Sequence, residues 1–282
     1  MLAGRILLVA FEGWNDATEG ASGTLKAIAE QLDVQTLDAV DPEDYFDFQF
    51  SRPMVEFDAQ GNRIISWPGC ELLQASPAKI SQNPSWENLY LLLGTEPSRR
   101  WLSFAGEILE MVQDREIDYV IMLGAMLADV PHTRPMQIFR SSQNESLQEL
   151  FDLEPSRYEG PVGILTVLAQ AFEAEGIPVL SLWGSVPHYV HNTTNTKAAL
   201  TFLNELATLT DLRFDTSNLA SLAFDWERSI DEMAQGDDEM SAYVTQLEKN
   251  RDDIDSEEVS GDQLAREFER YLRQRPESPD KA

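Results

Sequence analysis

The strongest constraint on the fold is a repeated alternation of short apolar segments with longer amphipathic ones. The apolar segments have the length of strands and comprise residues 5–11, 88–94, 118–124, 136–142 and 177–184. Apolar side chains recur at helical spacing in residues 18–32, 97–111, 163–175 and 196–209. Runs such as LLLG and VIML lack the polar alternation of a sheet with one solvated face, so both faces are expected to be buried. The sequence predicts an α/β fold with a mainly parallel sheet covered by helices on both faces.

The same patterns divide the chain into three parts. Residues 1–215 are expected to form the α/β core, with a β-hairpin near residues 54–67, where DAQGN supplies turn residues. Residues 216–250 have helical spacing alone and predict a helical hairpin that turns at GDDE. Its apolar stripes are Leu219, Leu222, Ala223, Trp226, Ile230 and Met233, then Met240, Tyr243, Val244 and Leu247. Residues 251–282 predict an acidic linker, a last helix and a disordered tail.

Charge excludes several classes of partner. The formal net charge is −28, from 49 acidic and 21 basic residues, whereas binding to phosphates requires clustered Lys and Arg. Nucleic acid and anionic membranes are therefore not expected as partners. Residues 225–262 hold fourteen acidic and three basic residues, so the outer face of the helical hairpin is a candidate docking surface for a basic protein.

Few residues are available for metal or redox chemistry. Cys70 is the single cysteine and the three histidines are His132, His188 and His191, with no spacing typical of a zinc site. Phosphate-binding and dinucleotide-binding glycine motifs are absent, so no cofactor and no metal are expected. One cysteine and no run approaching the roughly 20 apolar residues of a membrane span predict a cytoplasmic protein without a membrane segment.

The unusual polar residues follow the predicted strands. In open α/β sheets ligands bind in the crevice at the carboxyl ends of the strands, so these side chains are expected to converge there. The candidates for ligand binding or for an interface are Glu12, Asn15, Asp16, Glu96, Arg99, His132, Arg134 and His188. Structural roles compete with this interpretation: Asp16 can cap a helix, and Glu96 can pair with Arg99. No arrangement of a nucleophile with a base identifies a catalytic residue.

His132 and Arg134 stand between two prolines, in PHTRP. Pro131 and Pro135 stiffen this loop and leave it little ordering entropy to lose. The sequence predicts that Arg134 contacts a carboxylate of the protein itself, in its own or a neighbouring subunit, for example in the loop of Glu12 and Asp16. Its replacement would then lower stability or disrupt an oligomer. The alternative is an anionic ligand, whose affinity would be lost while stability stayed unchanged.

Several segments together resemble a known family. FEGWNDA, GTEPSRRW, LGAMLADVPHTRP, EGPVGILTVLAQAFEAEGIPVLSLW with VPHYV, and GDQLAREFERYLR occur in this order over nearly the whole chain. They resemble bacterial members, of the actinobacterial type, of the proteasome assembly chaperone 2 family. The resemblance implies a three-layer sandwich similar to the phosphorylase/hydrolase-like fold, a C-terminal helical extension and self-association. In archaeal and eukaryotic relatives it implies a role in assembling proteasome α-rings.

One departure from the family concerns the C-terminus. Some relatives bind α-rings through a final hydrophobic-Tyr-x tail, whereas this sequence ends in Ser-Pro-Asp-Lys-Ala and Tyr271 lies inside the last predicted helix.

Two functions of different classes follow from these observations. The first is a non-catalytic, chaperone-like protein that binds other proteins and forms a homo-oligomer, with a trimer as the first expectation. The alternative is a small-molecule enzyme or anion-binding protein of the hydrolase or phosphorylase type, in which His132 and Arg134 hold an anion in the strand-end crevice.

Overall fold

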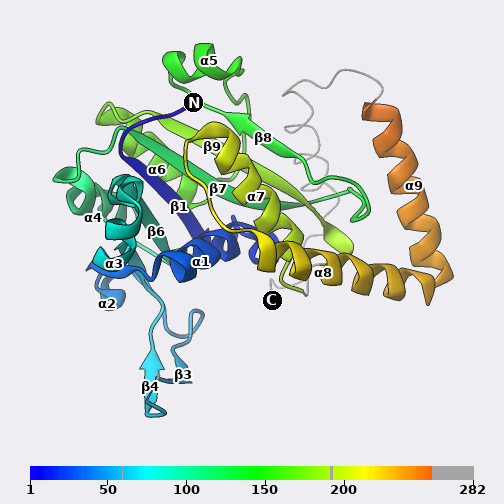
Figure 1. Cartoon of the computed structure of the whole chain (residues 1–282), viewed down its shortest axis with the longest axis horizontal. Helices are drawn as coiled ribbons and strands as arrows, with labels where there is room; N and C mark the ends of the chain where they lie inside the picture. Colours follow the sequence, from blue (N-terminus) through cyan, green and yellow to red (C-terminus); the bar gives the residue numbers. More distant parts are fainter. Residues whose placement is uncertain (59, 191–192, 256–282) are drawn as a thin grey trace, which may run out of the picture.

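A seven-stranded sheet forms the centre of the protein in this computed structural model, which describes residues 1–58, 60–190 and 193–255 (Figure 1). Across the sheet the strands are β2 (Gln35–Ala39), β5 (Cys70–Gln74), β6 (Leu89–Thr95), β1 (Ile6–Glu12), β7 (Tyr119–Ala128), β9 (Val179–Pro187) and β8 (Ile138–Ser141). The four strands β6, β1, β7 and β9 are parallel, whereas β5 pairs in antiparallel register with both β6 and β2, and β8 pairs in antiparallel register with β9. The predicted α/β fold is confirmed.

Helices cover both faces of this sheet. Helices α1 (Gly20–Leu32) and α7 (Thr196–Leu209) pack on one face, and α4 (Trp101–Gln113) and α6 (Ile164–Ala174) pack on the other. Successive residues of β1 point to opposite faces, and all six from Ile6 to Phe11 are buried. Burial on both faces explains why the central strands are continuous apolar runs.

The short elements connect these layers. They are η1 (Ala17–Glu19), α2 (Pro42–Tyr45), α3 (Pro77–Gln82), η2 (Pro84–Asn88), α5 (Glu145–Phe151) and η3 (His188–Val190). Strands β2 and β5 and helices α2, α3 and α5 had no apolar pattern long enough to predict them. Four of the five residues of β2 are exposed, so this edge strand has no apolar run.

A separate two-stranded hairpin projects from the body of the molecule (Figure 1). Its strands are β3 (Met54–Phe57) and β4 (Arg63–Ser66), and they pair in antiparallel register. At its base the rings of Phe48 and Trp67 meet edge to face, with their centroids 4.9 Å apart.

The C-terminal part consists of α8 (Ser217–Gln235) and α9 (Asp238–Asp255). The buried face of α8 holds Ala223, Trp226, Ile230 and Ala234, whereas Leu222 and Met233 are exposed. Assigning these two to the buried stripe was wrong, because each lies one position off the spacing of the buried set. The predicted start of the acidic linker, at residue 251, was also wrong, because α9 continues to Asp255.

The last helix and tail predicted from residue 261 onward lie outside the described residues. None of the helices in the described part of the chain combines the length and apolarity needed to cross a membrane.

Candidate functional site

The contacts of the eight candidate residues divide them into three groups instead of one crevice. One group follows β1 and β6, Arg99 lies apart before α4, and the third follows β7 and β9. Strand length explains the separation: Val9 of β1 pairs with Met122, and β7 continues beyond it to Ala128. The loops after β7 and β9 therefore start farther along the strand direction than those after β1 and β6.

In the first group, Glu96 occupies the N-terminus of α6. Its Oε1 accepts a hydrogen bond from the backbone N–H of Ile164 at 2.8 Å and another from Asn15 Nδ2 at 3.1 Å. The first N–H groups of a helix are the usual place for a bound anion. Here a carboxylate of the chain itself takes that position.

Asp16 has the helix-capping role that competed with ligand binding. Its Oδ1 accepts hydrogen bonds from the backbone N–H groups of Ala21 at 2.8 Å and Ser22 at 3.1 Å, in the first turn of α1. Burial raises the pKa of this carboxyl, against the opposing effect of these donors. Glu12, in turn, pairs with Lys26 at 2.6 Å.

Arg99 also makes contacts within its own chain. Its guanidinium donates to the backbone carbonyls of Glu43 and Asp44, within α2, and not to Glu96. The four charged side chains of the first two groups therefore all form hydrogen bonds or ion pairs within the core. They are Glu12, Asp16, Glu96 and Arg99.

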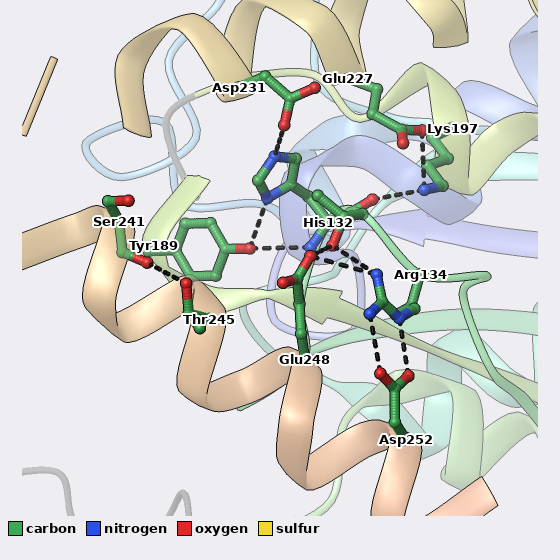
Figure 2. A network of polar contacts seen from close by, with 11 residues as sticks. His132, Arg134, Tyr189, Lys197, Glu227, Asp231, Ser241, Thr245, Glu248 and Asp252 are labelled. Carbon is green, nitrogen blue, oxygen red and sulfur yellow. Dashed lines mark hydrogen bonds and ion pairs between the residues drawn. The ribbon is translucent and has the colours of Figure 1, made fainter. Parts of the chain in front are cut away.

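His132 belongs to the third group, and Figure 2 shows its contacts. Its side chain is fully buried, with Nδ1 2.8 Å from the hydroxyl of Tyr189 and Nε2 3.0 Å from Oδ1 of Asp231 on α8. The hydroxyl of Tyr189 also accepts the backbone N–H of His132 at 2.8 Å. Because the carboxylate of Asp231 can only accept, Nε2 carries a proton and donates it to Asp231, and in the neutral imidazole Nδ1 accepts the hydroxyl proton of Tyr189. Burial raises the pKa of Tyr189, which keeps this hydroxyl protonated.

Arg134 is held by two carboxylates of α9. Its Nε and Nη2 donate to the two oxygens of Asp252 at 2.8 and 2.9 Å, and Nη1 donates to Glu248 at 3.2 Å (Figure 2). The hydrogen bond to Asp252 raises the pKa of Arg134, and the guanidinium lowers the pKa of Asp252. The prediction that Arg134 contacts a carboxylate of its own protein is confirmed, although the acids belong to α9 and not to the loop of Glu12 and Asp16.

Further polar contacts attach the same two helices to the core. Lys197 of α7 donates to the backbone carbonyl of His132 and pairs with Glu227 of α8 at 2.9 Å. Asp129 contacts His188 at 3.4 Å and accepts a hydrogen bond from Tyr243 of α9 at 3.3 Å. Burial, with Asp129 nearby, raises the pKa of Tyr243 to about 12.

We call this network the clasp. It joins core residues to α8 and α9 and consists of His132, Arg134, Tyr189 and Lys197 with Glu227, Asp231, Glu248 and Asp252. The cavity lined by His132 and Arg134 measures about 20 Å³, which is room for about one water molecule. The clasp is therefore a closed contact between two parts of the chain.

Of the eight residues of the clasp, the sequence singled out only His132 and Arg134. Tyr189 and Lys197 were missed because a Tyr after VPH and a Lys at the start of a helix are common on surfaces. Their partners on α8 and α9 were treated as part of one acidic face. The only available signal was the excess of acids in this region over the few cations that could pair with them.

Metal binding finds no support in the contacts. Within residues 1–58, 60–190 and 193–255, no three His, Cys, Asp or Glu side chains are gathered closely enough to hold a metal ion.

Comparison with known proteins places this geometry in a family. The PAC2 family model matches residues 10–234. A PAC2 family protein of Streptomyces avermitilis is 37% identical, with 85% of this chain and 99% of that chain covered and a TM-score of 0.74. The Mycobacterium tuberculosis proteasome-assembly chaperone homologue Rv2125 is 33% identical over the same shares, with a TM-score of 0.73. PbaB, an archaeal proteasome activator of Pyrococcus furiosus, shares the fold at 16% identity and a TM-score of 0.61, covering 82% of this chain and 93% of that chain. No match is found among curated proteins. The match over most of the chain and the two bacterial relatives show that this protein belongs to the PAC2 family.

Proposed function

We propose that the protein is a non-catalytic, self-associating protein that binds other proteins in a chaperone-like role. Membership of the PAC2 family supports the chaperone-like role, since one relative is named a proteasome-assembly chaperone homologue. The state of the clasp disfavours the anion-binding alternative, because Glu248 and Asp252 already neutralise Arg134 and the side chain of His132 is fully buried. A cytoplasmic location and the absence of a cofactor remain predictions.

The exposed hairpin carries the proposal of self-association. Seven large apolar side chains between residues 50 and 67 are exposed: Phe50, Met54, Val55, Phe57, Ile64, Ile65 and Trp67. An isolated two-stranded hairpin is at best marginally stable in water, and exposed apolar patches commonly mark interfaces. The charges of residues 50–67 cancel, since Arg52 and Arg63 balance Glu56 and Asp58. In a chain of charge −28, two copies can approach at this hairpin with little repulsion.

The register of the hairpin gives its two faces different chemistry. Glu56 is opposite Ile64, and Phe57 is opposite Arg63. Because cross-strand partners share a face, one face carries Met54, Glu56 and Ile64, and the other carries Val55, Phe57, Arg63 and Ile65. The carboxylate on one face complements the guanidinium on the other. We infer that the first face of one copy packs on the second face of the next, a head-to-tail contact that can close into a ring such as the expected trimer.

Charge reversal tests this packing. Glu56→Arg and Arg63→Glu should each dissociate the oligomer, because like charges then meet at every contact, whereas the double variant should restore it. Glu149→Arg, on the exposed surface of α5, is the matched control and should leave assembly unchanged. Size exclusion with light scattering gives the mass of each protein.

Each outcome of this experiment has a distinct meaning. A parent protein that stays at 31.8 kDa at micromolar concentration refutes self-association. A parent oligomer that survives both single variants refutes the hairpin as its interface but leaves self-association in place. Dissociation without restoration in the double variant refutes the head-to-tail packing.

The helical hairpin supports the protein-binding part of the proposal. Some of its acids face inward to the clasp, which the sequence did not predict. Others remain exposed on α8 and α9 and at the turn between them: Asp225, Glu232, Asp237, Asp238, Glu239 and Asp253. Phe224 is 67% exposed on the same helices. We infer a partner with a basic surface.

Affinity capture tests this partner. The parent protein should retain a basic-surfaced protein from native lysate, and the capture should weaken with salt because exposed charges are screened. Combined Glu232→Gln, Asp238→Asn and Glu239→Gln should remove it, whereas Glu145→Gln, Glu149→Gln and Asp152→Asn on and beside α5 should not. Equal capture by both triple variants would contradict the assignment of the acidic helices as the docking surface.

A further inference from the structure

A second cavity lies away from the clasp. It measures about 310 Å³ and is bounded by strands β7, β8 and β9, by helix α6 and by the loop of residues 154–162. None of the described residues of α8 or α9 lines it. Its volume falls at the lower end of the range for small-molecule sites, so it can hold a compact ligand of about two rings.

The floor of the cavity is aromatic. Trp183 of β9 and Phe139 of β8 are paired across neighbouring strands and both line the space. The indole of Trp183 packs directly on Gly124: a Cβ there would come within 2.7–2.9 Å of three of its ring atoms. Only glycine allows this approach. The ring is thereby held against β7, where it provides an apolar surface for stacking.

A residue in the wall of the cavity has a buried, unsatisfied hydrogen-bond acceptor. Asn15 is 1% exposed and lines the cavity. Its Nδ2 donates to Glu96, which as a carboxylate can only accept, so this contact fixes the orientation of the amide. Oδ1 is then left without a hydrogen-bond partner in the described structure. An unpaired buried acceptor costs about 1–3 kcal/mol, which a donor on a ligand would recover.

The charges around the cavity give no preference for an ion. Glu154 and Arg157 lie on the same loop at its rim and balance each other. Arg140 also borders the space, but its guanidinium pairs with Glu205 of α7. The remaining polar residues that line the space include Ser141 and Ser181, which lie opposite each other in the pairing of β8 with β9.

We propose that this cavity binds an uncharged, planar aromatic or heteroaromatic molecule that stacks on Trp183 and donates an N–H to Oδ1 of Asn15. This site is separate from the strand-end anion site of the alternative function, and it uses neither His132 nor Arg134. It also does not depend on the proposed protein-binding role.

Three probes of one ring system test the proposal. Naphthalene-2-carboxamide is neutral and has an N–H donor, methyl naphthalene-2-carboxylate lacks the donor, and the naphthalene-2-carboxylate ion adds a charge. The amide should bind the full-length protein with a Kd below about 1 mM, and the ester and the ion should each bind at least about tenfold more weakly. Calorimetry and quenching of tryptophan fluorescence report the binding.

Cavity-filling variants locate the site. Ala169→Trp on the α6 wall should abolish binding of the amide, and Gln170→Trp, at the next position but outside the lining, should retain it. Thermal melts show that each variant is folded. Thr166→Trp, at an exposed lining position, replaces Ala169→Trp if that variant does not fold.

Three results would overturn the proposal. The first is that the parent does not bind the amide at concentrations up to about 5 mM. The second is that the ion binds more tightly than the amide. The third is that the folded cavity-filling variant binds the amide as well as the parent does.

Discussion

Replacing His132 by alanine is expected to lower the free energy of unfolding by about 2–4 kcal/mol. The imidazole is fully buried and both of its nitrogens are hydrogen-bonded, so the change leaves a cavity and removes the donor to Asp231 and the acceptor for Tyr189. Urea denaturation measures the loss. The change also removes one of the links between the core and α8.

His188→Ala is the matched control. Its side chain is 36% exposed and its contact with Asp129 is 3.4 Å long, so its replacement should cost less than about 1 kcal/mol. Equal losses for the two histidines would show that His132 does not have the structural role assigned to it.

Replacing Arg134 by alanine should release α9 while leaving the core folded. The guanidinium is the shared partner of Glu248 and Asp252, and without it two carboxylates remain close together. We expect amide hydrogen exchange in α9 to become at least about tenfold faster, with little change in the central strands. Arg134→Lys should have an intermediate effect, since an ammonium cannot reproduce the two-pronged contact with Asp252.

The same pair predicts a dependence on pH. Because the guanidinium lowers the pKa of Asp252 below its usual value near 4, this attachment is present above about pH 4 and is lost as the pH falls through the lowered pKa.

The anion-binding alternative predicts a different result for Arg134→Ala: this variant would be as stable as the parent, and phosphate would stabilise the parent alone. Thermal melts with and without phosphate separate the two.

The central part of the fold was predictable because its sequence signal is local. Strands buried on both faces are apolar throughout, so β1, β6, β7 and β9 stand out from one sequence. The exposed edge strand β2 has no such signal. Near the end of α9, Asp252 is paired with Arg134, which lies 118 residues earlier in the sequence, and such a distant neutralising charge cannot be located from local composition.

The candidate site was predictable only in part, for a related reason. The sequence placed the candidate residues after strand ends, and Asp16 has the capping role weighed for it. The predicted convergence of these side chains assumed that neighbouring strands end at the same level, whereas β7 extends beyond the end of β1. The cavity beside Trp183 was not predicted, because it depends on Gly124 and Trp183 being neighbours across two strands.

The central position of β1 has a consequence for synthesis on the ribosome. This strand is made first, yet its neighbours in the sheet follow much later, since Ile6 pairs with Leu89 on one side and Tyr119 on the other. At roughly 5–20 residues per second, about 6–23 s pass before the second neighbour has been made. Until β6 has been made, ILLVAF, an apolar segment without a charge, has neither of its partners, and such segments are prone to aggregate. The nascent chain therefore needs protection over its first hundred or so residues, and slowing translation between β1 and β7 should increase aggregation.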